Sequence, residues 1–113
     1  MAQRPTTDFL VGALLRRVQG EGGSAMVLAR GEPMSGSILV LTLERGGNPR
    51  FFERMPTLDG GSALVATGPK NVQDEVEAAA YWQRRRERDR DLWVIELDIA
   101  EAERLAASVL IHG

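Results

Sequence analysis

The sequence contains no cysteine and only one histidine, His112, which is the penultimate residue. The absence of cysteine excludes disulfides, thiolate metal sites and cysteine nucleophiles. Catalytic triads with a histidine base are essentially excluded, because His112 lies where we expect a frayed chain end. Zinc and copper, which favour histidine and cysteine ligands, are poor candidates for the same reason. We therefore predict neither a metal site nor a cofactor.

The sequence also lacks any apolar run close to the roughly 20 residues that a membrane helix requires. Its opening, MAQRPTTDF, does not show the basic and then apolar pattern of a signal peptide. We therefore expect a cytoplasmic protein without a membrane partner. With 113 residues, 43% of them hydrophobic and 27% charged, the chain is predicted to form a single domain over residues 1–113, with residues 1–5 as a loose tail.

Lysine is nearly absent, since 13 of the 14 basic residues are arginine and Lys70 is the exception. Arginine suits bidentate recognition of phosphate or carboxylate groups. A biased genome composition explains the same preference without any site. The net charge of −2 argues against a surface that binds nucleic acids generally. Nucleic acid is therefore a partner that the composition allows but does not favour.

Residues 71–98 form the stretch around which the fold is organised. Its first part is predicted to be a long helix capped by Asn71, with one apolar face that packs onto a sheet. This face consists of Val72, Val76, Ala79, Ala80 and Gln83. Trp82 lies on the flank of the helix, in a position to cover a sheet edge or an interface. The apolar run at residues 92–95 then predicts a central strand that is covered on both faces.

The rest of the chain supplies two further helices and four strands. A helix is predicted from Thr6 or Thr7 to about Gln19, and a last helix is predicted to start with Asp98 and Glu101 as a capping box. The apolar face of that last helix consists of Ala102, Leu105, Ala106 and Val109. Four strands, separated by turn signals, are predicted at residues 24–30, 37–45, 50–55 and 62–67.

These elements predict an α+β fold in the order α-β-β-β-β-α-β-α. We expect one mixed, mostly antiparallel sheet with the helices packed mainly on one face. The pattern leaves open on which side of the four-strand meander the fifth strand joins.

Four acidic side chains near the junction of the long helix and the last strand offer the only route to catalysis. They are Asp89, Asp91, Glu96 and Asp98. Carboxylates at strand ends resemble the core of metal-dependent nucleases, which suggests a metal-assisted phosphodiester or phosphate enzyme. That hypothesis requires at least three of these carboxylates to converge on one cleft. The usual acid-x-lysine element is absent, because Glu53-Arg54 lacks the spacing and arginine is a poor general base. The alternative is that these acids cap helices or pair with arginines.

A second set of candidate residues is basic and suggests anion binding. It comprises Arg84, Arg85, Arg86, Arg88 and Arg90, with Arg16, Arg17 or Arg30 as reinforcement if folding brings them together. Successive helical positions turn by about 100°, so these arginines do not form a single stripe. Glu87, Asp89 and Asp91 also partly neutralise them. A solvated and self-paired helix end is the alternative interpretation.

The glycine-rich segments do not match a nucleotide-binding motif. GEPMSGS, residues 31–37, has no lysine after its second glycine, and GEGG, residues 20–23, follows a helix instead of a strand. Both are interpreted as turns. Trp93 lies inside the apolar strand and is predicted to belong to the core, which leaves Trp82 as the candidate interface residue.

The passage RRRERDRDLWVIELD, residues 84–98, resembles the signature of a family of small bacterial proteins catalogued as domain of unknown function 1491. That signature is an arginine-rich helix followed by Asp-Pro-Asp-Leu-Trp-Val-Val-Glu-Ile-Glu. Residues 9–40 are similar to the family's opening, a helix with paired arginines, a glycine turn, and two strands around a turn. The family-like residues are Arg16, Arg17, Arg30, Arg84, Asp89, Asp91, Trp93 and Glu96. The departures are Arg90 for proline, Arg88 for an aromatic residue, Glu32 for aspartate and Asp98 for glutamate.

The resemblance implies a single-domain cytoplasmic protein without an established activity. We therefore expect a non-enzymatic interaction domain that acts through a protein partner or through self-association as a homodimer. Short strands and the long helix leave an edge or apolar flank near Trp82 that association would cover. The two alternatives are the metal-assisted enzyme and the binding of anions or nucleic acids by residues 84–90.

Overall fold

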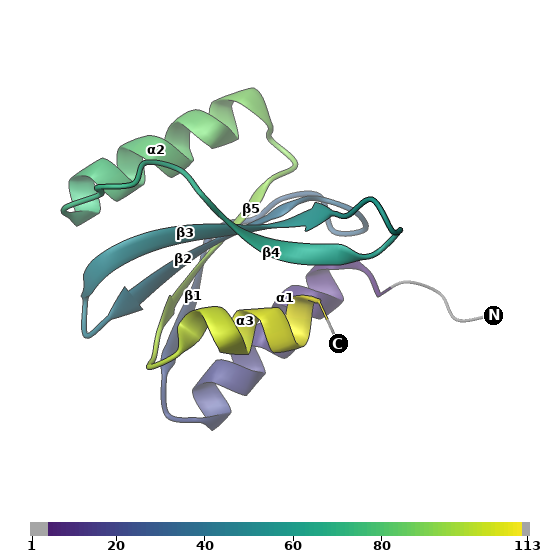
Figure 1. Ribbon diagram of the computed structural model, residues 1–113, viewed down its shortest axis with the longest axis horizontal. Helices are drawn as coiled ribbons and strands as arrows, with labels where there is room; N and C mark the ends of the chain where they lie inside the picture. The colour runs from purple at the N-terminus through teal and green to yellow at the C-terminus, as the bar shows by residue number, and fades with distance from the viewer. Residues whose placement is uncertain (1–4, 112–113) are drawn as a thin grey trace.

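A computed structural model describes residues 5–111 (Figure 1). The helices and strands, in chain order, are α1 (Thr7–Gly20), β1 (Ser24–Ala29), β2 (Ile38–Glu44), β3 (Gly47–Pro56), β4 (Ser62–Thr67), α2 (Glu75–Arg88), β5 (Trp93–Asp98) and α3 (Ala102–Leu110). This is the predicted order of elements. Residues 1–4 of the predicted tail, and His112, lie outside the described residues. Of the helices within residues 5–111, none is both long enough and apolar enough to cross a membrane.

The five strands form one mixed sheet in the order β1-β5-β2-β3-β4. β5 runs parallel to β2, and the other neighbouring strands are antiparallel. The central position predicted for residues 92–95 is confirmed. The expectation of a four-strand meander is wrong, because β5 lies between β1 and β2 and separates them. An apolar strand without a polar face is stable only where both faces and both edges are covered, and this position covers all four.

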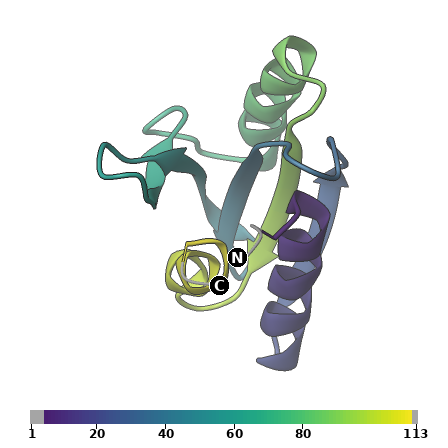
Figure 2. The same ribbon diagram turned by 90° about the vertical axis from the view of Figure 1, so that its right-hand side faces the viewer.

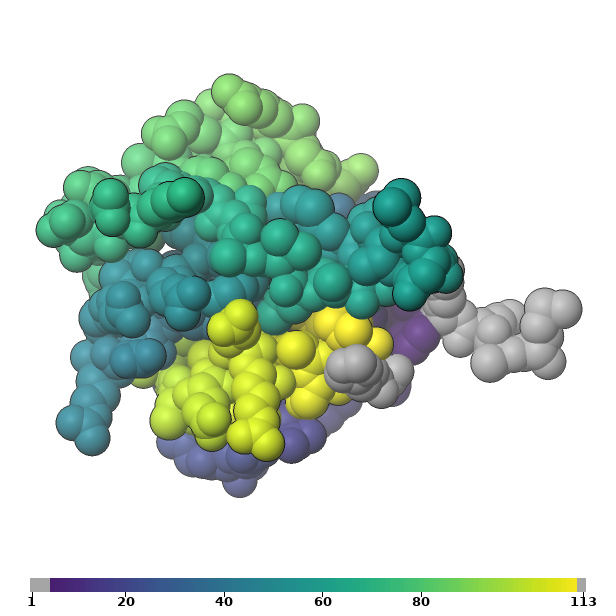
Figure 3. Space-filling model, in the orientation of Figure 1, coloured from purple at the N-terminus to yellow at the C-terminus, as the bar shows by residue number. Residues whose placement is uncertain are grey.

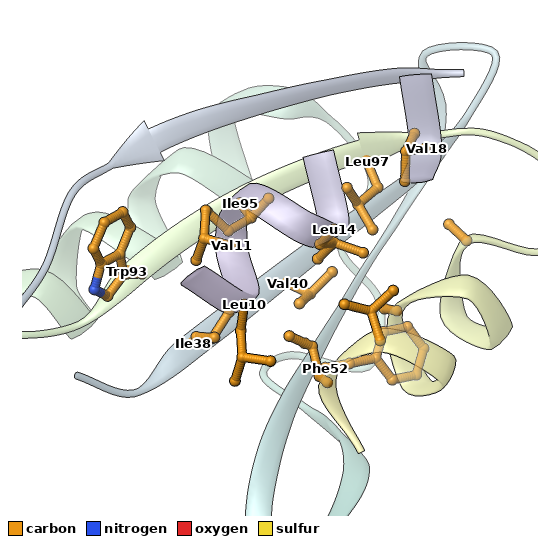
Figure 4. Close-up of a cluster of buried hydrophobic side chains, with 14 residues drawn as sticks. Leu10, Val11, Leu14, Val18, Ile38, Val40, Phe52, Trp93, Ile95 and Leu97 are labelled. Carbon is orange, nitrogen blue, oxygen red and sulfur yellow. The ribbon is translucent and has the colours of Figure 1, made fainter. Parts of the chain in front are cut away.

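The helices cover both faces of the sheet unequally. α1 and α3 lie on one face and α2 lies alone on the other (Figures 1 and 2), so the expectation that the helices pack mainly on one face holds for two of the three. Alternate residues of β5 enter the two cores. Trp93 and Ile95 belong to the core beneath α1 and α3, with Val11 of α1 between them (Figure 4). Leu92 and Val94 belong to the core beneath α2.

α2 begins later than its sequence indicates. Asp74, not Asn71, is the N-cap, and its carboxylate accepts a hydrogen bond of 2.9 Å from the backbone N–H of Glu77. The Glu77 carboxylate in turn accepts from the N–H of Gln73 at 3.0 Å, as in a capping box. Val72 is partly buried in the core in the segment that leads into the helix. The predicted apolar face is therefore wrong for the helix proper.

The only fully buried residue of α2 is Ala78, while Val76 remains 78% exposed. Ala79, Tyr81 and Trp82 are half-buried beside it. An alanine at the contact carries little apolar surface, so packing against the sheet contributes less to holding this helix than it does for α1 and α3.

The predicted capping box of α3 is also wrong. The Asp98 carboxylate accepts hydrogen bonds from the backbone N–H groups of Arg45 and Gly46, at 2.9 and 2.8 Å, and therefore fastens the β2–β3 turn to the end of β5. Glu101 is the N-cap residue, but its side chain makes no capping hydrogen bond and its φ is 56°. The apolar face predicted for α3 is confirmed, since Ala102, Leu105, Ala106 and Val109 are all buried.

Candidate functional site

The turn at residues 31–37 is fastened to the start of β5. The backbone N–H of Glu32 donates to the Asp91 carbonyl at 3.0 Å, and the indole N–H of Trp93 donates to the Glu32 carbonyl at 2.8 Å. A Cβ on Gly31 or Gly36 would lie 2.1 or 2.3 Å from the Asp91 carbonyl oxygen, so only glycine permits this approach. The interpretation of this segment as a turn is confirmed. Its glycines serve close backbone packing.

Glu32 stabilises the same turn from within. Its carboxylate accepts from the backbone N–H groups of Ser35 and Met34, at 2.7 and 3.1 Å, and these bonds lower its pKa below the ordinary value. The Arg30 guanidinium lies 5.1 Å from the centre of the Trp93 ring, within reach of a cation–π interaction. The prediction that Trp93 belongs to the core is confirmed, because its side chain is 1% exposed.

The four candidate carboxylates do not converge. Asp89 accepts a hydrogen bond of 3.0 Å from the backbone N–H of Asp91, and Asp98 is engaged by the β2–β3 turn. The Asp91 side chain is exposed, and Glu96 is half-buried on the α2 face of the sheet. Within residues 5–111, no group of three or more Asp, Glu, His or Cys side chains is arranged to hold a metal ion. The metal-assisted hypothesis therefore lacks the arrangement that it requires in this part of the chain.

The arginine candidates divide into separate groups. Arg16 and Arg17 are exposed on α1, on the opposite face of the sheet from α2, and Arg17 pairs with Glu21. Arg86 donates to the carbonyls of Arg90 and Leu92, the latter at 3.1 Å, and therefore binds the end of α2 to the start of β5. The arginines of this run that remain exposed are Arg84, Arg88 and Arg90. Folding therefore does not gather the predicted set onto one surface.

Arg85 makes a contact that the sequence did not reveal. Its Nη2 donates to Glu53 Oε2 at 2.9 Å, and its Nη1 donates to the Tyr81 hydroxyl at 3.0 Å. Nη1 also lies 2.9 Å from Glu53 Oε1, but Oε1 accepts no hydrogen bond from residues 5–111, so charge alone acts there. The bond to Glu53, followed by the bond to Tyr81, raises the Arg85 pKa despite partial burial. The ion pair joins α2 to β3.

One signal in the sequence points to this pair. Glu53 follows Phe51 and Phe52 on an alternating strand, which places it on a covered face, and a buried acid requires a partner of opposite charge. The phenylalanines confirm the two faces, since Phe51 belongs to the core beneath α2 and Phe52 to the core beneath α1 and α3. What the sequence does not provide is which of the arginines faces Glu53.

A cleft lies between α2 and the sheet. In Figure 3, α2 stands as a ridge above the strands. The cleft has a volume of about 320 Å³. It is lined by Leu28, Leu41, Leu43, Pro49, Glu75, Ala78, Ala79, Trp82 and Glu96. Ala78, the small residue at the contact of α2 with the sheet, forms part of the lining, and Leu41 and Leu43 beneath it are each 4% exposed. Trp82, the predicted interface residue, forms part of its wall.

The cleft is apolar apart from its acids. Burial raises the pKa of Glu96 above the ordinary carboxyl value, and the negative charges of Glu75 and Asp98 add to the effect. No lysine or arginine within residues 5–111 forms an ion pair with Glu96. The sequence predicts Glu96 as one of four metal-binding or catalytic acids, whereas folding places it in an apolar groove beside Trp82.

The model of a family described as "Protein of unknown function (DUF1491)" matches residues 6–107. The chain belongs to this family. A crystal structure of a DUF1491 family protein from Caulobacter crescentus CB15 is similar to it, with 29% sequence identity, a TM-score of 0.78, and coverage of 90% of this chain and 94% of that one. No match was found among curated proteins.

Two solution structures are also similar to this chain. An NMR structure of a DUF1491 protein from Caulobacter crescentus CB15 has 28% identity and a TM-score of 0.74, and covers 92% of this chain and 94% of that one. The solution structure of Atu0922 from A. tumefaciens has 27% identity and a TM-score of 0.70, with coverage of 96% and 93%. The family-like residues Arg30, Asp91 and Trp93 meet at the turn on β5, while Glu96 lies in the cleft beneath α2.

Proposed function

We propose that this DUF1491 protein is an interaction domain that binds a segment of a protein partner in the cleft beneath α2. The observation that carries the proposal is an open apolar groove that contains a half-buried acid without a cationic partner in residues 5–111. A volume of about 320 Å³ accommodates one or two side chains of a partner segment. The cytoplasm, expected from the sequence, is where we propose that this partner is met.

The arrangement supports binding more than catalysis. Two of the four candidate acids, Asp89 and Asp98, are engaged by backbone N–H groups, which is a structural role. Two of the arginines at the end of α2, Arg85 and Arg86, hold the helix to β3 and to the start of β5. The cleft, by contrast, contains apolar side chains and an acid that the rest of the fold does not use. A mostly apolar pocket with a few polar groups is typical of binding sites.

Site-specific photo-crosslinking in cells tests this proposal. Trp82→p-benzoylphenylalanine places a crosslinker of similar size in the wall of the cleft. Phe9→p-benzoylphenylalanine is the matched control, because Phe9 is an aromatic residue of α1 that is 60% exposed on the opposite face. We expect a discrete crosslinked product from position 82 that is absent from position 9. A product of twice the monomer mass identifies a second copy of the chain, and another mass identifies a different protein.

Both crosslinking variants must retain the wild-type thermal unfolding midpoint for the comparison to hold. If position 82 then gives no more product than position 9, the cleft is not an interaction site and the proposal is wrong.

A further inference from the structure

The charge in the cleft beneath α2 has one sign. Of its nine lining residues, seven are apolar and the two ionisable ones, Glu75 and Glu96, are both acidic. Asp98 projects from the same face of β5 as Glu96, because the two are separated by one residue of an extended strand. Its charge adds to that of Glu75 in opposing ionisation of Glu96. The groove is therefore electronegative as well as apolar.

α2 places opposite charges beside two of the acids on this face of the sheet, Glu53 and Glu96. α2 presents Arg85 to Glu53, which compensates the charge of that acid. Near its other end it presents Glu75 to Glu96, which opposes the charge. An acid set against an acid in partly apolar surroundings is unfavourable in the isolated protein, and such conflicts concentrate where a ligand relieves them.

We infer that the cleft receives a basic side chain, with lysine as the best fit, from the partner segment. This inference rests on the proposed function and names the chemistry of its partner. The aliphatic stem of a lysine packs against Leu28 and Ala79, the half-buried apolar residues of the lining, and its ammonium group binds between Glu96 and Glu75. The indole of Trp82 adds an aromatic wall of the kind that attracts cations. Charge complementarity therefore selects a basic amphipathic segment over an acidic or neutral one.

The direct test is an NMR titration of ¹⁵N-labelled protein with n-butylammonium chloride, which reproduces the end of a lysine side chain. The comparison ligand is n-butanol, which has the same chain length without the charge, at matched ionic strength. We expect saturable shifts at Leu28, Ala79 and the Trp82 indole N–H with butylammonium, and weaker binding of butanol.

Glu96→Gln and Glu103→Gln form the matched pair of variants, because Glu103 is exposed on α3 beneath the opposite face of the sheet. We expect Glu96→Gln to weaken the binding of butylammonium by about fivefold and Glu103→Gln to leave it unchanged. Binding of butanol should not differ between the two variants. If butylammonium and butanol bind equally, or if Glu96→Gln binds butylammonium as the wild type does, the inference is overturned.

The outcomes separate this inference from the proposed function. If position 82 crosslinks but the cleft shows no preference for the ammonium group, the proposed interaction cleft stands and the inference of a basic side chain is refuted. If the cleft prefers the ammonium group but no protein is crosslinked, the inference that a protein partner supplies the basic side chain is overturned, and a free small amine is indicated as the ligand. Preference for the ammonium group together with a crosslinked peptide that contains lysine at the contact supports the inference in full.

Discussion

Removal of the Arg85 side chain is expected to destabilise the protein by detaching α2 from the sheet. Glu53 is buried, and Arg85→Ala would leave its carboxylate without a cation. Breaking one partner of a fully buried pair costs about 3–5 kcal/mol of the free energy of unfolding. The two side chains are 26% and 12% exposed, so solvent screening reduces the expected loss to about 2–3 kcal/mol. For a chain of this size, that lowers the melting temperature by roughly 10 °C.

Urea unfolding followed by circular dichroism measures this loss, and Arg84→Ala is the control. Arg84 is the exposed neighbour of Arg85, and its removal should change the free energy of unfolding by less than about 0.5 kcal/mol. The double variant Glu53→Leu with Arg85→Met removes both charges and should recover most of the loss. Native-state hydrogen exchange should show faster exchange in α2 of Arg85→Ala. An Arg85→Ala protein as stable as Arg84→Ala would refute the reasoning, as would a double variant no more stable than Arg85→Ala.

Three further predictions concern the turn at residues 31–37, which is fastened to the start of β5, and the cleft. Gly31→Ala should lower the free energy of unfolding by more than about 2 kcal/mol, because the new Cβ would lie 2.1 Å from a backbone oxygen. Gly20→Ala, which has open space around its Cβ, should leave the free energy of unfolding unchanged in the same urea assay. Trp93→Phe removes the 2.8 Å hydrogen bond to the Glu32 carbonyl and should lower the stability by about 1–2 kcal/mol or more, measured by thermal unfolding. An unchanged melting temperature would contradict the conclusion that this hydrogen bond fastens the 31–37 turn to β5. Glu96 has a raised pKa in the folded protein, so its ionisation disfavours folding as pH rises through the carboxyl range. Glu96→Gln should therefore raise the melting temperature at neutral pH but not at a pH below the ordinary carboxyl pKa. An equal change at both pH values would contradict this.

The sequence predicts which segments form helices and strands, but it does not predict how the strands are ordered. The apolar run in residues 92–95 indicates that both faces of this strand are covered, yet any neighbouring strand satisfies that pattern. The helix caps were missed for a similar reason. Asn71 and Asp74 are both good cap residues by type, and the helix begins after Asp74 while Val72, in the segment before it, packs against the core.

The site was less predictable than the fold. The run of arginines from residue 84 to residue 90 looks uniform in sequence, but its members have different partners. Arg85 faces an acid 32 positions away on β3, and Arg86 reaches carbonyls that follow the helix. Glu96 could be identified as a candidate from its strand. Its apolar surroundings come from residues of β1, β2 and α2, among them Leu28, Leu41 and Ala78, which only the folded chain brings together.

The position of β5 has a consequence for how the protein is made. β1 and β2 each pair with β5 within the sheet, yet β5 is the last strand to be synthesised. Until residue 98 has left the ribosome, β1 has no neighbouring strand, and the apolar faces of β2 and β3 have only part of their cover. The nascent chain must therefore wait with exposed strand edges until nearly the whole sequence is available, and the sheet closes in one late step.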